Sequence, residues 1–409
     1  MARRKISIVG GGAAGFFAAL AAAEADSSAE IVIFEATAHP LAKVRISGGG
    51  RCNVTHACFE PRDLVRFYPR GGRELLGAFT RWQPRDTVTW FADHGVATKT
   101  EADGRMFPVT DDSATVVDCL RNAATRAGII LRTGCGVTAV RRSDAGFALT
   151  LTTGESHGCA GLLLATGGNK SNAGFAIARE FGHAIEPPVP SLFTFHCDDA
   201  RLRELSGLSV EDAEASVASA KLIQRGPVLV THWGLSGPAI LKLSAWGARV
   251  LHDCDYAFAL RVNWLPALRP EAVWEALRRE RDANPRRQVT TANPFGLPAR
   301  LWDRLVVAAG LAETATWSGV GNASLRDLAT QLGAGEFAVK GKSLFKEEFV
   351  TCGGVRLSEV DFRTMESRRV PGLHFAGEVL DIDGVTGGFN FQAAWTTGWL
   401  AGRALGGGR

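Results

Sequence analysis

The sequence contains no C-x-x-C pair, and the spacing of its eight cysteines does not resemble a set of metal ligands. The cysteines are scattered over positions 52, 58, 119, 135, 159, 197, 254 and 352. Structural zinc sites and redox-active disulfides use closely spaced thiols, so we expect neither, and no other metal site. Scattered reduced thiols are typical of a cytosolic protein, and we expect a cytoplasmic location.

The chain also lacks a convincing leader or membrane span. The residues from Ile6 to Ala23 carry no charge, but four glycines within Gly10 to Gly15 would interrupt a helix, and no small-residue cleavage site follows. A strand, a turn and a helix explain this run better, and we expect no membrane partner.

Charge of either sign is limited. Charged residues make up 22% of the chain, apolar residues 46%, and the net charge is only +4. This composition excludes a disordered or fibrous chain and is typical of a soluble enzyme. The length of 409 residues allows two or three domains with a large core.

A glycine-rich turn near the start has the spacing of a dinucleotide-binding fingerprint. Residues 5–9 and 29–36 indicate strands and residues 13–25 a helix, which together form a βαβ unit. The turn has the pattern G-x-G-x-x-G, in which glycine permits a tight turn, the approach of a pyrophosphate and close helix packing. The residues expected to bind phosphate are Gly10, Gly12, Ala13, Ala14 and Gly15.

Glu35 ends the second strand, twenty residues after Gly15. A carboxylate there accepts hydrogen bonds from an adenosine ribose and repels a 2′-phosphate, which favours FAD or NAD over NADP as the bound nucleotide. No second G-x-G-x-x-G occurs. NAD(P)H, as an electron donor, would therefore use the same face as the substrate, each in turn.

The segment 374–402 favours FAD over NAD. Gly377 and Glu378 follow a strand, and Gly387 and Gly388 precede a helix that starts near Asn390. The acid suits the ribityl hydroxyls of a flavin, and the helix N-terminus suits the N1–C2 carbonyl edge of the ring. Turn geometry alone would also explain the glycines, but the presence of a fingerprint at both ends of the chain favours a flavin.

The sequence pattern changes between the N-terminal and C-terminal parts of the chain. Prolines 187, 188 and 190 indicate a linker, strand-like segments follow it, and residues 270–335 have helical spacing and heavy charge. We therefore expect an α/β protein with a Rossmann-like FAD-binding domain, an inserted β-rich, barrel-like domain and a helical insert. The FAD-binding domain is expected to span residues 1–188 and 346–409. The β-rich domain is expected to span residues 189–265 and 336–345, and the helical insert residues 266–335.

Several segments resemble, in order, the signatures of the BaiN/RdsA-like family of FAD-dependent oxidoreductases. They are "IVGGGAAG", "KVRISGGGRCNVTH", "LLLATGG", "THWGLSGPAIL", "VTCGGV" and residues 364–402. The resemblance implies a glutathione-reductase-like FAD domain and the reduction of electron-poor C=C bonds. One branch reduces a bile-acid enone, and another reduces uridine in ribosomal RNA to dihydrouridine. The segment 169–185 is shorter than in relatives, which leaves the active-site shape and the substrate open.

The resemblance also places the loop of residues 43–56 beside FAD. Three glycines would give the backbone room, Arg51 would offer charge to the phosphates, and Ser47 and Asn53 would offer neutral hydrogen bonds; Lys43 either contributes or only solvates the loop. The cofactor-binding residues that it implies are Lys43, Ser47, Gly48, Gly49, Gly50, Arg51, Cys52, Asn53, Thr166, Gly167, Gly377, Glu378, Gly387, Gly388, Phe389 and Asn390.

Two residues are candidate proton donors. Cys52 is near cations that would lower the pKa of its thiol, or else it packs the loop as a small buried residue. His232 lies in a glycine-rich turn and either faces the flavin, where a histidine would be a natural proton donor, or bonds to backbone.

The expected function is the reduction of an activated C=C bond in a small enone-like molecule, with electrons from NAD(P)H passing through FAD. Ribosomal RNA dihydrouridine synthesis is an alternative, in which arginines 278, 279, 281, 286 and 287 would bind the RNA backbone. The same arginines also fit a solvated helix face. A third alternative is a non-catalytic or sensory flavoprotein whose inserted domain binds a partner.

Overall fold

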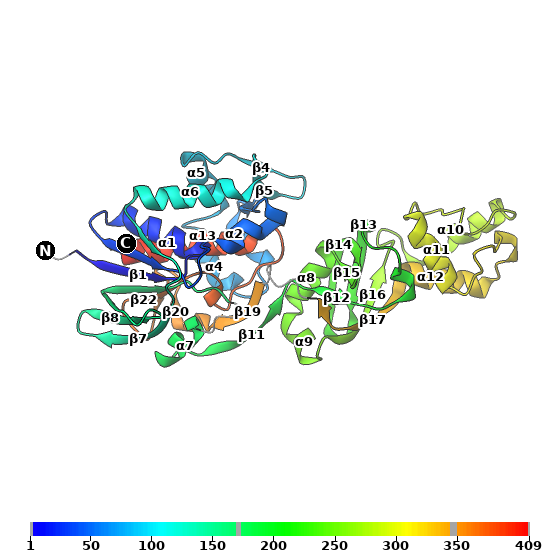
Figure 1. Ribbon diagram of the computed structural model, residues 1–409. Coiled ribbons are helices and arrows are strands. Elements are labelled where there is room, and N and C mark those ends of the chain that lie inside the picture. The colour runs from blue at the N-terminus through cyan, green and yellow to red at the C-terminus, as the bar shows by residue number, and fades with distance from the viewer. Residues whose placement is uncertain (1–2, 169–172, 344–349, 408–409) are drawn as a thin grey trace. The chain divides into compact units, whose positions relative to one another are not determined.

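The computed structural model describes residues 3–168, 173–343 and 350–407. The chain divides into two compact units, of which the first comprises Met1–Ser191 and Phe345–Arg409 and the second Leu192–Leu344. Both ends of the chain belong to the first unit (Figure 1). The division of the inserted residues into a β-rich and a helical domain stays a prediction.

A parallel sheet forms the centre of the first unit. Its strands lie in the order β22 (Leu373–Phe375), β10 (Gly161–Leu164), β1 (Lys5–Val9), β2 (Glu30–Phe34) and β6 (Ile130–Arg132), and the short strands β21 (Glu366–Ser367) and β20 (Val360–Asp361) extend it beyond β22. Ile8 is in register with both Ile33 and Leu163. β1, β2 and β10 are buried along most of their length, as strands of a covered parallel sheet are. This is the Rossmann-like arrangement expected from the sequence.

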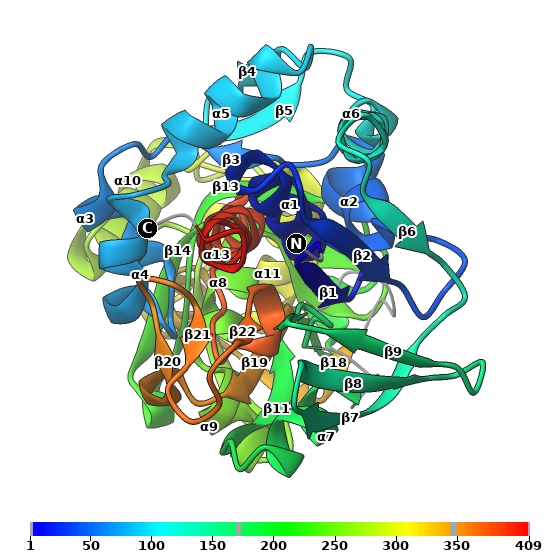
Figure 2. The same ribbon diagram turned by 90° about the vertical axis from the view of Figure 1, so that its left-hand side faces the viewer.

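The first and last helices of this unit, α1 (Ala13–Ala25) and α13 (Phe389–Leu405), lie side by side (Figure 2). A Cβ atom on Gly398 would lie 2.6 Å from the Ala14 carbonyl oxygen, and one on Gly402 would lie 2.1 Å from that of Ala18. The two helices are therefore parallel and in backbone contact, which only glycine permits. Gly398 is nine residues after the start of α13, whereas Ala14 is one residue after the start of α1, so the N-terminus of α13 extends about 12 Å beyond that of α1.

Shorter elements surround this core. Further helices are α2 (Ala42–Ile46), α3 (Pro61–Leu64), α4 (Gly72–Phe79), α5 (Pro84–Asp93), α6 (Ser113–Arg126) and α7 (Ala173–Glu180). Two antiparallel sheets contain β3 (Thr55–His56), β5 (Arg105–Pro108) and β4 (Thr98–Thr100), and β7 (Val137–Ser143), β8 (Gly146–Leu151) and β9 (Ser156–Cys159).

The second unit contains an antiparallel sheet and several helices. Its strands lie in the order β17 (Gly335–Lys340), β16 (Ala257–Asn263), β13 (Ser209–Val217), β14 (Leu222–Thr231), β15 (Gly234–Ser236), β12 (Thr194–His196) and β18 (Lys342–Ser343). Its helices include α8 (Pro238–Trp246), α9 (Ala248–Asp253), α10 (Pro270–Ala283), α11 (Ala299–Ala308) and α12 (Asn322–Ala334).

The proline-rich residues 187–190 do not form the linker expected from the sequence. They belong to β11 (Ile185–Ser191), which pairs antiparallel with β19 (Val350–Val355) in a two-stranded sheet. The register shifts between Glu186 and Val189. Proline lacks an N–H donor and is tolerated in edge strands and at bulges, so a two-stranded sheet with a register shift accommodates it.

Candidate cofactor-binding site

The glycines of the fingerprint have different roles. Gly10 has a φ of +112°, and a Cβ on it would lie 2.3 Å from the Ala165 carbonyl oxygen. A Cβ on Gly15 would lie 2.0 Å from the Gly10 carbonyl oxygen. A Cβ on Gly12 would have no neighbour within 4 Å. The fold itself therefore requires Gly10 and Gly15, whereas Gly12 leaves open space in front of α1.

The N-terminus of α1 adjoins this space. Gly12 is the N-cap of the helix; no side chain of the described residues caps it, and no acidic residue lies in its first turn. The first N–H groups of a helix lack intrahelical partners and carry partial positive charge. Ala13 and Ala14 thus start a helix whose end suits a phosphate group.

Glu35 holds the loops at the end of β2. Its Oε2 accepts a hydrogen bond of 2.8 Å from the Gly11 N–H, and its Oε1 accepts two, each 2.8 Å long, from the Thr37 N–H and hydroxyl. A carboxylate has about four acceptor positions, so the half-buried Glu35 retains capacity for one ribose hydroxyl.

The loop after α2 has an unusual backbone. Gly48, Gly49 and Gly50 have φ values of +59°, +69° and +85°. Only glycine adopts such a run without strain. Cβ atoms on Gly49 and Gly50 would meet nothing within 4 Å, so these residues border open space. Ser47 does not extend into it, because its hydroxyl donates to the Val44 carbonyl at 3.0 Å.

Lys43 and Glu378 form an ion pair between the two ends of the chain, with Nζ 2.5 Å from Oε2. Glu378 follows β22 in a short 3-10 turn at Gly377. A Cβ on Gly167 would lie 4.0 Å from Glu378 Oε2, so the turn after β10 adjoins the same carboxylate. The neighbouring Thr166 hydroxyl is buried beneath Gly174 of α7 and has no hydrogen-bond partner among the described residues.

The Arg51 charge is not directed at an open phosphate site. Its guanidinium lies 2.6 Å from Glu101 Oε1 and 3.6 Å from Asp111 Oδ1, and stacks 4.0 Å from the centre of the Phe107 ring. Carboxylates of its own unit thus already compensate this charge, a contact that the sequence did not indicate.

Asn53 connects the glycine loop to α13. In the amide orientation that satisfies both of its polar groups, the side chain donates to the Thr55 carbonyl and accepts from the Gly388 N–H, each at 2.9 Å. Gly388 has a φ of +91°, and a Cβ on it would lie 2.5 Å from the Thr55 carbonyl oxygen. Asn53 therefore positions the N-terminus of α13 from the side of the glycine loop.

Of the two alternatives for Cys52, the structure supports the packing residue over the activated thiol. Its side chain is fully buried, and burial raises the pKa of the thiol to about 12, so the nearby cations do not lower it. Arg51 is paired with Glu101. Cys52 remains protonated and packs the loop.

The start of α13 has a well-defined side-chain environment. Gly388 is the N-cap, and no side-chain hydrogen bond from the described residues caps the helix. Phe389 stacks against both His56 and Phe67, with ring centres 4.6 and 4.4 Å apart. Asn390 does not face outward, because its amide exchanges two hydrogen bonds, of 2.8 and 2.9 Å, with the Gly384 backbone.

His56, which was not among the residues expected from the sequence, adjoins the start of α13. It lies directly after the glycine loop, and a Cβ on Gly387 would lie 3.5 Å from its ring. His56 Nε2 lies 3.1 Å from the Asp103 carbonyl oxygen. The only available signal was its place at the end of the quoted loop motif.

His232 lies in the second unit. With Trp233 it forms the two-residue turn between β14 and β15, and both side chains are exposed. Trp233 is 53% exposed, whereas Trp395 is fully buried in the core of the first unit. Of the arginines near α10, Arg281 contacts Asp282 and Asn322, whereas Arg278 and Arg279 are exposed.

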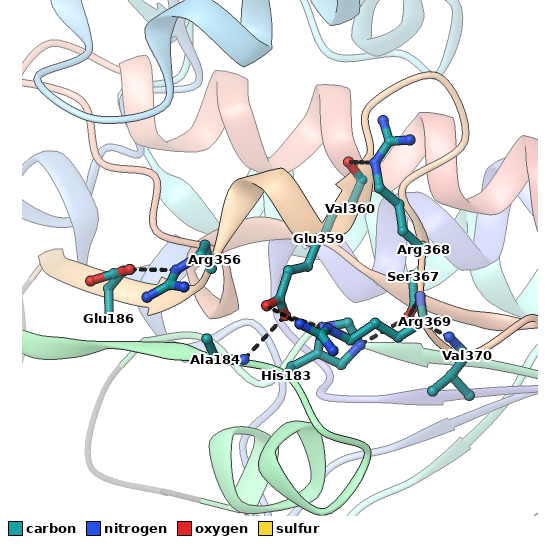
Figure 3. A network of polar contacts seen from close by, with 10 residues as sticks. All are labelled: His183, Ala184, Glu186, Arg356, Glu359, Val360, Ser367, Arg368, Arg369 and Val370. Atoms are coloured by element: carbon teal, nitrogen blue, oxygen red, sulfur yellow. Dashed lines mark hydrogen bonds and ion pairs between the residues drawn. The ribbon is translucent and has the colours of Figure 1, made fainter.

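A buried Ser–His–Glu arrangement in the first unit has triad-like distances (Figure 3). His183 Nδ1 lies 2.9 Å from Glu359 Oε2, and Nε2 lies 2.9 Å from Ser367 Oγ. Ser367 Oγ also accepts hydrogen bonds from the Arg369 and Val370 N–H groups, at 3.0 and 2.8 Å. A buried hydroxyl with all of its hydrogen-bonding positions used is no nucleophile, so this network is structural.

No group of three or more His, Cys, Asp or Glu side chains that would hold a metal ion occurs within residues 3–168, 173–343 and 350–407. Nor does any helix in that part of the chain have the length and apolar character to cross a membrane.

Residues 4–404 match the family model described as the HI0933-like protein Rossmann domain. The chain belongs to this family. It is 32% identical over 416 residues to a ribosomal RNA dihydrouridine synthase of Escherichia coli, with 99% of this chain and 98% of the relative covered. It is 30% identical over 411 residues to a 3-dehydro-bile acid delta(4,6)-reductase of Clostridium scindens, with 98% of both chains covered. The family resemblance seen in the sequence is confirmed.

Solved structures share the fold at low sequence identity. An open-form flavocytochrome c3 fumarate reductase matches 99% of this chain and 78% of its own, with a TM-score of 0.52 and 18% identity. A 3-ketosteroid-delta4-(5alpha)-dehydrogenase from Rhodococcus jostii matches 98% and 97%, with a TM-score of 0.53 and 15% identity. The expected Rossmann-type fold is confirmed.

Proposed function

We propose that the protein is an FAD-dependent oxidoreductase that reduces an activated C=C bond with electrons from NAD(P)H. The observation that carries this proposal is the pair of parallel helices α1 and α13, whose N-termini are offset by about 12 Å and carry no side-chain cap from the described residues. This offset separates a diphosphate held at one helix from a ring held at the other, as an extended flavin dinucleotide requires.

The residues between these helix ends fit FAD. The space at Gly12 would take the pyrophosphate, the remaining acceptor position of Glu35 a ribose hydroxyl, and Glu378 the ribityl hydroxyls. The N-terminus of α13 would place partial positive charge at the ring, which favours its anionic reduced form. When bound, FAD supplies hydride transfer; the chain binds the dinucleotide and orients its ring.

The names of the relatives support the reaction class. A bile acid reductase and a dihydrouridine synthase both carry out the saturation of a conjugated C=C bond. The substrate that we favour is a small enone-like molecule. Ribosomal RNA dihydrouridine synthesis is the second candidate function, and the exposed side chains of Arg278 and Arg279 would suit an RNA backbone. A cytoplasmic location agrees with the scattered free cysteines.

Turnover tests this proposal. The purified protein, reduced anaerobically with NADPH or NADH, would be mixed with a 3-keto-4-ene steroid or with ribosomal RNA lacking dihydrouridine, and flavin absorbance would be followed. Faster flavin reoxidation by the steroid would support an enone-like substrate. Faster flavin reoxidation by the RNA would support ribosomal RNA dihydrouridine synthesis. Reoxidation by neither would favour a non-catalytic or sensory flavoprotein.

His232 is the residue that we propose to deliver the proton during substrate reduction. It is exposed on a turn, and histidine is the side chain that most often serves as a general acid. His232→Gln should slow reoxidation by substrate about a hundredfold while FAD content stays unchanged. His252→Gln, an exposed histidine of the same unit, is the control. Equal rates in both variants would rule out His232 as the donor.

A further inference from the structure

A cleft of about 730 Å³ lies in the first unit beside edge strand β6. It is formed by the segment from Ala38 to Ile46, by α6 and by β6. Figure 2 shows α2 next to α6, and the two helices are in contact. Its volume is that of a typical small-ligand pocket.

The cleft combines an apolar wall with basic side chains. Pro40, Ile46, Val117 and Leu131 form the apolar part, and Thr133 adds a hydroxyl. The basic residues that line it are His39, Lys43, Arg45 and Arg121.

Two of these charges lack a compensating acid. Arg45 and Arg121 are exposed, and neither forms an ion pair with any residue that the structure describes. Among the residues that the structure describes, those lining the cleft include no acidic side chain. Lys43, by contrast, pairs with Glu378, which places one wall of the cleft next to the proposed FAD site.

This combination suits an adenine nucleotide that carries a phosphate monoester. The apolar wall fits a planar base, and arginine binds phosphate oxygens with paired N–H groups. The only phosphates of FAD form its diphosphate, which the N-terminus of α1 accommodates, so FAD would leave Arg45 and Arg121 without an anion. Glu35, which would repel a 2′-phosphate, does not line the cleft.

We propose that this cleft binds the adenosine 2′-phosphate of NADPH and makes NADPH the preferred electron donor. The inference rests on the proposed function in taking a nicotinamide nucleotide as the donor. Arg45, on α2, and Arg121, on α6, hold the phosphate from two sides, while the base packs on the apolar wall.

Binding to the FAD-loaded protein tests the cleft without turnover. In calorimetric titrations, 2′,5′-ADP should bind at least about tenfold more tightly than 5′-ADP, because only the former carries the 2′-phosphate. Arg45→Gln and Arg121→Gln should each remove most of this preference. Arg126→Gln, an exposed arginine on α6 outside the cleft, should keep it. Inorganic phosphate should compete weakly in the wild type.

Three results would overturn the inference. One is equal affinity for the two nucleotides. Another is a preference unchanged in both cleft variants. The third is loss of FAD in Arg45→Gln or Arg121→Gln at unchanged melting temperature, which would make the cleft part of the FAD site. If NADPH reduces the flavin but 2′,5′-ADP binds no more tightly than 5′-ADP, only the proposed 2′-phosphate site in the cleft is contradicted. If 2′,5′-ADP binds more tightly as expected but neither NADPH nor NADH reduces the flavin, the proposed phosphate site in the cleft is supported and the proposed electron donor is contradicted.

Discussion

Lys43 Nζ lies 2.5 Å from Glu378 Oε2, although 335 residues separate the two in the sequence. The lysine belongs to α2, near the N-terminal fingerprint, and the glutamate follows β22 near the C-terminus. The contact joins the two segments that the proposed FAD site uses. Both ends of the chain therefore meet within the first unit.

Gly12 and Gly15 should respond differently to alanine. Gly12→Ala should keep its melting temperature without cofactor, because its Cβ meets nothing within 4 Å, but should bind FAD at least tenfold more weakly. Gly15→Ala should lower the stability of the fold itself by about 2 kcal/mol, since its Cβ would lie 2.0 Å from the Gly10 carbonyl oxygen. Thermal unfolding and FAD titration of both variants check this. A Gly12→Ala protein that retains full flavin affinity would contradict the phosphate site.

Glu35→Ala should weaken FAD binding about tenfold, because it removes the ribose acceptor and releases the Gly11 and Thr37 N–H groups. Thr37→Val is the matched control, since it keeps the carboxylate and deletes the hydroxyl that donates to Glu35 and contacts the His39 backbone. Its effect should be smaller. The FAD dissociation constants of these variants can be measured by fluorescence quenching. Equal constants for the wild type and Glu35→Ala would contradict the proposed hydrogen bond between Glu35 and the ribose.

Cys52 should be unreactive in the folded protein, because burial raises the pKa of its thiol to about 12. At pH 8, Ellman's reagent should label the exposed Cys254 rapidly and Cys52 only after unfolding. Cys52→Ala should also leave flavin reoxidation unchanged. Peptide mapping after brief labelling provides the check, and modification of Cys52 at a rate similar to that of Cys254 would contradict its packing role.

The His183 network should make stability depend on pH. Burial lowers the pKa of His183 below its ordinary value of 6.5, despite its contact with Glu359. Above pH 6.5 the imidazole is neutral in both states and its contribution is complete. As the pH falls below 6.5 the unfolded chain takes up a proton first, so the free energy of unfolding decreases.

Urea denaturation at pH 7.5 and 5.5 measures this effect. His183→Ala should cost about 2 kcal/mol at pH 7.5, because it leaves buried Glu359 and Ser367 groups without a partner. Its stability should also depend less on pH than that of the wild type. His252→Gln, at an exposed position, should retain the wild-type dependence. Identical pH profiles for wild type and His183→Ala would contradict the lowered pKa.

Local structure was predictable where neighbouring residues decide it. Residues 5–9 and 13–25 were expected as a strand and a helix, and correspond to β1 and α1. The prolines of residues 187–190 indicated a linker instead of β11, because a strand partner far along the chain, β19, sets that conformation. β13 carries acidic and small residues, and its strand conformation is held by pairing with β14 and β16.

The sequence by itself determined the nucleotide fingerprint, its Glu35 and the likeness of both chain ends to a flavin site. These depend on short spacings, on the backbone freedom of glycine and on the period of apolar residues, all of which are visible along the chain. Only the tertiary structure decided that Cys52 is buried and that Arg51 pairs with Glu101. It alone also showed that His56 stacks on Phe389 and that two arginines face a cleft without an acid. Burial and charge pairing depend on contacts between distant segments, which only the folded chain brings together.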